Sequence, residues 1–150
     1  MQVRDIMRRD VRTVAASDTF RSASKALREH RISSLVVTGD HGAAGIVTER
    51  DFVRLVADGL DPATTPLADR MTTELVTIDP RADIAEAARL MRKAGVRHLP
   101  VMDREQLVGI LSMRDVLSWG VAEMTGGHEL PDVEGSAAAL SAAVGLERPG

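Results

Sequence analysis

The chain contains no cysteine and very few aromatic residues, and both absences limit what it can be. Without cysteine it forms neither a disulfide nor a thiolate metal site, which is typical of a cytoplasmic protein. Aromatic residues make up 2% of the 150 residues, although 44% are hydrophobic. The core must therefore consist of aliphatic side chains packed by shape, as in a fold of short strands and helices.

Long hydrophobic runs and an excess of positive charge are missing as well. No stretch approaches the roughly 18 apolar residues of a membrane-spanning helix, and residues 1–5 do not begin a signal-peptide hydrophobic region. A formal net charge of −3 provides no broad basic surface for a nucleic acid. We therefore expect a cytoplasmic protein whose partners include neither a membrane nor a nucleic acid.

The usual motifs of catalysis and metal binding are also missing. The sequence has no Gly-x-Ser-x-Gly elbow, no nucleophilic cysteine and no Walker loop for phosphates. The four histidines, His30, His41, His98 and His128, show no paired metal-ligand spacing. The sequence thus predicts neither an enzyme nor a metal centre.

An internal repeat spans most of the chain. Residues 3–53 align with residues 67–117 at a constant offset of 64 without a gap, and 11 of the 51 pairs are identical. Composition alone would give roughly three or four identities. The sequence therefore predicts a duplication, and corresponding signals should form corresponding structures.

Each copy begins with the signals of a strand and a helix. A β-prone run with a threonine comes first, at residues 11–14 and 75–78. A cap-rich stretch follows, Ser17 and Asp18 in the first copy and Asp79 and Pro80 in the second, where Pro80 suits a first helical turn. Apolar residues then recur at helical spacing and predict one buried face per helix: Phe20, Ala23 and Leu27, and Ile84, Ala87, Ala88 and Met91.

Each copy continues with the signals of a hairpin and a second helix. Two apolar runs flank a polar turn in both copies, and the second helix opens after Thr48 or Ser112. Each repeat is therefore predicted to be β-α-β-β-α, which makes the fold class α/β (α+β). The predicted domains are repeat 1 at residues 1–60, a linker at 61–66, repeat 2 at 67–120 and a mobile tail at 121–150.

A seven-residue motif ends both hairpins. Residues 45–51, Gly-Ile-Val-Thr-Glu-Arg-Asp, and residues 109–115, Gly-Ile-Leu-Ser-Met-Arg-Asp, share the pattern Gly-h-h-[Ser/Thr]-x-x-Asp, where h is apolar. This pattern resembles that of the CBS (cystathionine β-synthase-type) domain. Residues 96–101 are similar to the family's middle-strand signature and residues 3–7 to its usual opening, whereas Val36 departs from the expected proline. The resemblance covers about residues 1–120 and implies a tandem CBS pair, or Bateman module, with two repeats related by pseudo-twofold symmetry.

The Ser/Thr-x-x-Asp spacing also has a physical meaning of its own. A hydroxyl at a helix N-terminus lies beside unpaired backbone N–H groups and the positive end of the helix dipole, which suits a phosphate. A carboxylate one turn later can accept two hydrogen bonds from a ribose diol. The same spacing forms a capping box without any ligand, and the two roles are compatible. The spacing alone leaves both open.

The family resemblance implies two ligand pockets between the repeats. The first combines Thr48 and Asp51 with Val76, Thr77, Arg97 and His98, and the second combines Ser112 and Asp115 with Arg12, Thr13, Ser33 and Ser34. Arg50 and Arg114 adjoin the aspartates and either add charge or lie exposed on their helices. For Arg97 and His98 the alternative is a solvated pair at a strand edge.

The resemblance implies a regulatory module that senses energy or metabolite state by binding AMP, ADP or ATP. S-adenosylmethionine and NAD are less favoured, because no residue specifies them. A ligand-free dimeric interaction or scaffold module is the competing hypothesis. We also expect a homodimer, since family members commonly pair their apolar helix faces, and a target protein that the sequence does not name.

Overall fold

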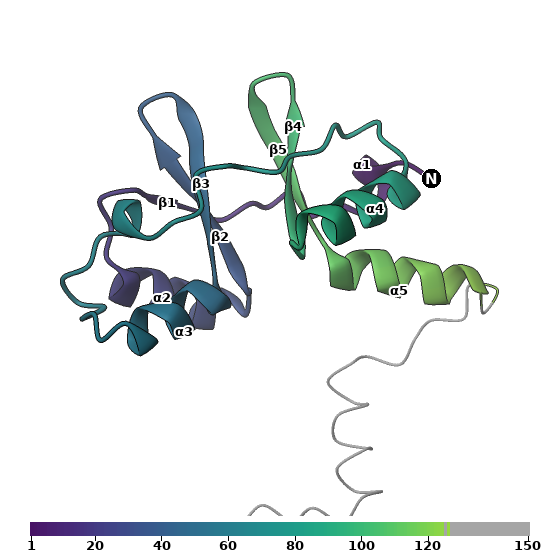
Figure 1. The fold of residues 1–150 in the computed structure, drawn as a ribbon. Coiled ribbons are helices and arrows are strands. Elements are labelled where there is room, and N and C mark those ends of the chain that lie inside the picture. Colours follow the sequence, from purple (N-terminus) through teal and green to yellow (C-terminus); the bar gives the residue numbers. More distant parts are fainter. Residues whose placement is uncertain (125, 127–150) are drawn as a thin grey trace, which may run out of the picture. The chain divides into compact units, whose positions relative to one another are not determined.

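The computed structural model describes residues 1–124 and 126. Residues 1–113 form one compact unit, and the chain from residue 114 onward belongs to a second, so each is described by itself. The elements follow one another as α1 (Val3–Ile6), β1 (Thr13–Ala15), α2 (Phe20–His30), β2 (Ser34–Gly39), β3 (Gly42–Thr48), α3 (Glu49–Ala57), η1 (Leu67–Asp69), α4 (Ile84–Ala94), β4 (His98–Asp103), β5 (Gln106–Ser112) and α5 (Met113–Met124) (Figure 1).

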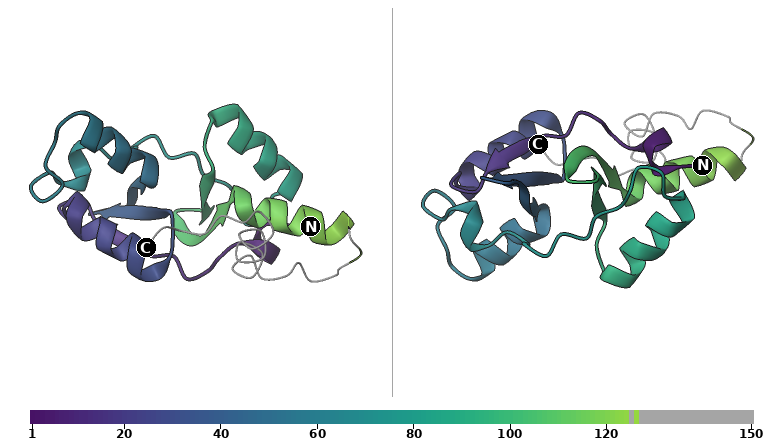
Figure 2. Two further views of the ribbon diagram at one scale, coloured as in Figure 1. Left: turned by 90° about the horizontal axis from the view of Figure 1, so that it is seen from below. Right: turned by 90° about the horizontal axis from the view of Figure 1, so that it is seen from above.

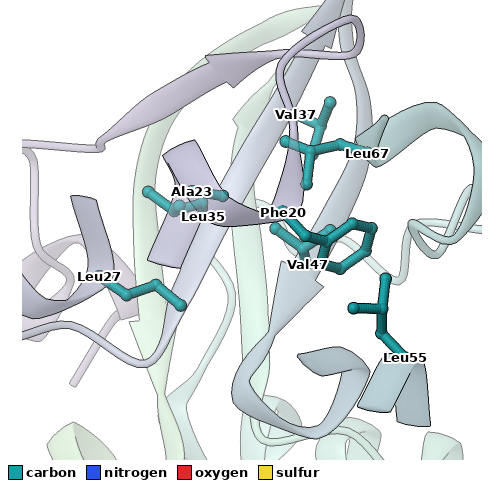
Figure 3. Close-up of a cluster of buried hydrophobic side chains, with 8 residues drawn as sticks. All are labelled: Phe20, Ala23, Leu27, Leu35, Val37, Val47, Leu55 and Leu67. Carbon is teal, nitrogen blue, oxygen red and sulfur yellow. The ribbon is translucent and has the colours of Figure 1, made fainter. Parts of the chain in front are cut away.

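The first repeat has all five predicted elements, β1-α2-β2-β3-α3. Strand β2 pairs antiparallel with β3 and parallel with β1. The predicted apolar face of α2 is buried, and Phe20, Ala23 and Leu27 join side chains of β2, β3 and α3 in one cluster (Figure 3). Phe20 also meets Phe52 edge to face, with ring centroids 5.0 Å apart. The few aromatic residues of this repeat therefore contribute directly to its core.

The second repeat continues in the same order, α4-β4-β5-α5, but its first strand is reduced to an isolated bridge. Strands β4 and β5 pair antiparallel, and Ile84, Ala87 and Met91 of α4 are buried as predicted. The run at residues 75–78 forms only a single bridge, between Ile78 and Val101. In the first repeat Ala16 donates its N–H to the Thr38 carbonyl at 3.2 Å, but the equivalent residue of the second is Pro80, which has no N–H. At the other end Val36 donates its N–H to the Arg12 carbonyl at 3.4 Å, and its counterpart Pro100 has no N–H either, so the pairing is lost on both sides of Ile78.

Both helix starts lie later than predicted. Thr19 caps α2 by accepting a hydrogen bond from the Ser22 N–H at 3.3 Å, and Asp83 caps α4 by accepting from the Ala85 N–H at 2.8 Å. Ser17, Asp18, Asp79 and Pro80 instead precede the helices. Asp18 and Asp79 accept hydrogen bonds from nearby backbone N–H groups in those preceding turns, so they are unavailable as helix caps.

The opening segment of each repeat packs against the other repeat. The bridge between Arg8 and Ile110 has its counterpart, at the offset of 64, in the bridge between Thr72 and Ile46. The bridge from Gln2 to Asp83 corresponds in the same way to that from Pro66 to Thr19. From α1, the purple segment crosses to β1 in both views of Figure 2. The two repeats are thus joined by reciprocal, symmetry-related contacts within residues 1–113.

These crossings explain the glycine of the shared motif. A Cβ atom on Gly45 would lie 2.6 Å from the Met71 Sδ and 2.9 Å from the Thr72 carbonyl oxygen. On Gly109 it would lie 2.5 Å from the Met7 Sδ and 3.0 Å from the Arg8 carbonyl oxygen. Both glycines are therefore required by the close approach of a backbone from the opposite repeat.

We expect Gly45→Ala to destabilise the protein by about 1–3 kcal/mol, because the methyl group overpacks a site lined by backbone. Met71→Ala in the same chain should not restore stability fully, since the Thr72 carbonyl oxygen stays in place. Gly120→Ala is the control, because its Cβ would meet nothing within 4 Å and alanine favours the helix. Chemical denaturation measures all three; equal stability of Gly45→Ala and the wild type would contradict the expectation.

Helix α5 extends four residues beyond the predicted end of the second repeat, to Met124. The rest of the predicted mobile tail, apart from residue 126, lies outside the described residues. Within the described part of the chain, every helix is too short or too polar to cross a membrane.

Candidate functional site

The motif Thr48-x-x-Asp51 forms the start of α3. Thr48 is the N-cap, and one oxygen of Asp51, Oδ2, accepts hydrogen bonds from the Thr48 N–H at 2.8 Å and the Thr48 hydroxyl at 3.3 Å. The other oxygen, Oδ1, lies 3.6 Å from the Arg54 guanidinium. The capping role anticipated for this spacing is therefore present. Oδ1 keeps the capacity to accept further hydrogen bonds.

Asp51 is buried, so water screens its charge less than it would screen the charge of an exposed carboxylate. Its side chain is 8% exposed, whereas that of Arg54 is 66% exposed and extends into solvent. A carboxylate at this position also lies in the first turn of α3, where the helix dipole favours negative charge. Asp51 is thus a hydrogen-bond acceptor held in a fixed position in the first turn of the helix.

The strand register brings Ser34 and Thr48 together. They are directly paired between β2 and β3, and the Ser33 carbonyl accepts a hydrogen bond from the Glu49 N–H at 3.2 Å. The hairpin explains this pairing, because it returns the end of β3 to the start of β2. That Ser33 and Ser34 line the other pocket, with Ser112, stays a prediction.

His98 links the two sets of predicted residues. Its Nε2 forms a 2.9 Å hydrogen bond with the Ser33 hydroxyl, so it reaches the residue beside the start of α3. Through β4 and β5 it is also the direct partner of Ser112. Residues that the sequence analysis divided between two pockets are therefore contiguous at His98.

The other predicted residues occupy separate positions. Arg12 pairs with Asp10 at 3.1 Å, and Thr13 pairs with Val36 between β1 and β2. The Arg97 carbonyl accepts from the Met113 N–H at 2.9 Å, while the residue as a whole is exposed. Val76 is half-buried and Thr77 is exposed, in the segment before Ile78. Arg50 is exposed on α3. Arg114 and Asp115 belong to α5 and are described apart from residues 1–113.

A cavity of about 370 Å³ opens beside Asp51. Its lining includes Leu55 and Ala57 of α3 and Thr72, the residue at which the opening segment of the second repeat meets β3. Of the residues predicted for the first pocket, Asp51 lines this cavity. The volume falls in the range of small-molecule sites.

Two arginines of this cavity were missed by the sequence analysis. Arg54 lies three residues after Asp51 on one helix face, a spacing that could have drawn notice. Arg70 is held by a 2.9 Å ion pair with Asp58, a contact twelve residues apart that carries no sequence signal. At the offset of 64 their counterparts are Ser118 and Ile6, so the duplication does not supply the same charges twice.

The cavity suits a ligand with both sugar and phosphate groups. Its two arginines and two aspartates balance, but Arg54 is only loosely paired, at 3.6 Å, and can turn toward an anion. Leu55 and Ala57 supply an apolar surface. No group of three or more His, Cys, Asp or Glu side chains able to hold a metal ion occurs among residues 1–124 and 126.

Comparisons with known proteins agree with this architecture. The CBS domain family model matches residues 3–58 and again residues 67–122. The CBS domain-containing protein YhcV of Bacillus subtilis is 30% identical over 132 residues, which cover 87% of this chain and 94% of YhcV.

Two solved structures share the fold. A hexameric CBS-CP12 protein from bloom-forming cyanobacteria superimposes with a TM-score of 0.73 at 33% identity, over 78% of this chain and 69% of that one. The CBS domain pair of protein MJ0100, solved with 5′-methylthioadenosine and S-adenosyl-L-methionine, gives a TM-score of 0.76 at 24% identity, over 82% of this chain and 98% of that one.

The duplication is thereby placed in a known family. Each matched segment contains one copy of the Gly-to-Asp motif and one hairpin. The prediction that the chain is not an enzyme agrees with its relatives, since the match to YhcV, a CBS domain-containing protein, covers 94% of that protein. The chain belongs to the CBS domain family and carries two CBS domains in tandem, which form a regulatory ligand-binding module.

Proposed function

We propose that this CBS pair is a regulatory module that binds AMP, ADP or ATP at the cavity beside Asp51. The observation that carries the proposal is the cavity of about 370 Å³, in which a buried carboxylate adjoins two arginines. In this arrangement Oδ1 of Asp51 accepts hydrogen bonds from the ribose diol, and Arg54 and Arg70 bind the phosphates. Leu55 and Ala57 supply apolar contact. The ligand class also agrees with the adenosyl compounds bound by the MJ0100 pair, a protein of the same fold.

The two pockets should differ in strength. The expectation from sequence was a tighter pocket at Thr48 and Asp51, because Arg97 and His98 would add charge there. The hydrogen bond between His98 and Ser33, the residue whose carbonyl accepts from the first residue of α3, supports the nearness of His98 to that pocket. Arg54 and Arg70 now add to the same expectation, since Ser118 and Ile6 replace them in the duplicate. We propose that the Ser112 and Asp115 pocket is the weaker one by about 1 kcal/mol, or several-fold in affinity.

Calorimetry with AMP, ADP, ATP, adenosine, S-adenosylmethionine and NAD tests the proposal. Binding of a phosphorylated adenosine at micromolar to low-millimolar strength, tighter than adenosine itself, supports it. Preference for S-adenosylmethionine or NAD would redirect the assignment to those ligands. Silence across the panel would leave the scaffold hypothesis, with dimerisation as the module's whole role.

We further propose that the protein is a homodimer that works in the cytoplasm. Val53 and Val56 are 69% and 70% exposed and lie three residues apart on α3, so they form a continuous apolar face. The hexameric CBS-CP12 protein shows that a relative assembles. The lack of cysteine supports the proposed location in the cytoplasm. A target protein would bind the ligand-bound and ligand-free dimers with different affinities.

Light scattering should give about twice the 16.1 kDa chain mass. Val53→Asp should lower that mass toward the monomer, because a charge would be buried in the apolar interface. Ser24→Asp is the control, because it adds the same charge at an exposed position of α2, and it should leave the dimer intact. A monomer at every concentration would refute the dimer.

A further inference from the structure

A second cavity lies between α1 and the hairpin of the second repeat, away from Asp51. Its volume is about 210 Å³, and its lining combines three arginines, Arg4, Arg9 and Arg81, with Asp103 and apolar side chains. None of these residues belongs to the nucleotide pockets described above. The inference drawn from it is therefore independent of the proposed function.

Backbone hydrogen bonds hold the arginines at this place. The Arg4 N–H donates to the Pro80 carbonyl at 2.9 Å, which fixes α1 against the loop that carries Arg81. Arg8 and Ile110 exchange two hydrogen bonds of 2.9 Å, which fix the chain next to Arg9 against β5. Three positive side chains from distant parts of the sequence are thus anchored around one hollow.

Arg81 is the rigid member of this group. Its guanidinium donates to both carboxylate oxygens of Asp79, at 2.9 and 3.0 Å, and to Asp103 at 3.0 Å. These hydrogen bonds from Arg81 hold the pKa of Asp79 below its ordinary value. The charge of Arg81 is therefore compensated within the protein.

Arg4 and Arg9 differ from Arg81 in this respect. Within residues 1–124 and 126, neither has a carboxylate within 4.0 Å, and the Arg9 guanidinium donates to the Arg4 carbonyl at 3.2 Å. Both side chains lie at the surface with donors to spare. The cavity thus has two uncompensated positive charges, on Arg4 and Arg9, beside the fixed and compensated charge of Arg81.

The duplication shows that the fold does not need these charges. At the offset of 64, Arg4, Arg9 and Arg81 correspond to Ala68, Thr73 and Ser17. The equivalent backbone bonds nevertheless form, since the Ala68 N–H donates to the Ala16 carbonyl at 2.9 Å. The same architecture is therefore built once with neutral residues and once with three arginines.

We propose that this cavity binds a small phosphate-type oxyanion through Arg4 and Arg9, with Arg81 as a rigid wall. Guanidinium groups match the planar, paired oxygens of phosphate, and two of them can each make a bidentate contact. A cavity of 210 Å³ accommodates a phosphate or pyrophosphate group. Val108 in its wall lies four residues before Ser112 on β5, about 13 Å along an extended strand, so the site is separate from the nucleotide pockets.

The test is a titration of the full chain with sodium pyrophosphate at low salt, followed by backbone amide NMR. Amides of residues 4–9, 81 and 82 should shift and saturate. Arg4→Gln with Arg9→Gln should weaken this binding about tenfold or more, because both charge-assisted contacts are lost. Arg21→Gln with Arg89→Gln, two exposed arginines elsewhere, is the matched control for net charge and should keep it. Thermal unfolding of each variant checks the fold.

Competition of ATP and AMP with pyrophosphate identifies the source of the oxyanion. If ATP displaces pyrophosphate from these amides and AMP does not, the cavity takes the phosphate chain of a nucleotide; if neither displaces it, the cavity takes free oxyanion. Asp51→Ala should leave the titration unchanged even where it abolishes nucleotide binding. The proposal fails if these amides do not shift at millimolar pyrophosphate, or if the control pair loses binding as much as the Arg4 and Arg9 pair.

Discussion

Asp51→Ala should abolish the tighter nucleotide-binding event and leave the weaker one. The buried carboxylate is the proposed ribose acceptor, and each charge-assisted hydrogen bond is worth about 1.5–3 kcal/mol, so affinity should fall at least about tenfold. The same substitution removes the acceptor for two hydrogen bonds from Thr48 and should cost about 1 kcal/mol of stability. Calorimetry with AMP measures the first effect and denaturation the second.

Asp51→Asn separates binding from capping. An amide oxygen can still accept from the Thr48 N–H, so this variant should stay near wild-type stability, yet it lacks the charge and should bind AMP weakly. Asp115→Ala, the duplicate position, should remove only the weaker event. If Asp115→Ala instead abolishes the tight event and Asp51→Ala leaves it untouched, the two pockets are assigned the wrong way round.

Phe20→Ala should lower the free energy of unfolding by about 3–5 kcal/mol, the largest stability effect expected in this chain. The Phe20 side chain is fully buried, in contact with Phe52 and with the cluster shared by α2, β2, β3 and α3. The neighbouring side chains can fill the resulting cavity only in part. Urea denaturation of the full chain measures the change.

Arg21→Ala is the control for this experiment, since Arg21 is the next residue on α2 and its side chain is exposed. A change within about 0.5 kcal/mol is expected there. A loss of less than 1 kcal/mol in Phe20→Ala would mean that the first-repeat core tolerates the cavity by rearranging, contrary to the close packing described here.

The local elements could be predicted because their signals lie within a few residues of one another. The apolar face of α2 was read from Phe20, Ala23 and Leu27, and all three are buried. The start of α3 after Thr48 was read from the motif and is confirmed. Helix starts were less accurate, because several capping residues precede α2 and α4 and only the turn geometry selects Thr19 and Asp83 among them.

The candidate site was only partly predictable. Asp51 was named from its spacing, but Arg70 reaches the cavity through an ion pair with Asp58 and a crossing that no local pattern encodes. The grouping of Ser33, Ser34 and His98 also depended on strand register, since each hairpin returns its own middle strand to the motif. That nucleotides bind at the cavity beside Asp51 stays a prediction.

The sequence by itself determined the duplication, the β-α-β-β-α order and the family, because a gapless offset of 64 and two copies of one motif are properties of the chain alone. Only the tertiary structure decided which segment packs on which repeat. Each opening segment crosses to the other repeat, where Gly45 and Gly109 let its backbone approach closely. Such contacts join residues at least 26 positions apart, so they depend on the packing of whole elements and not on local preference.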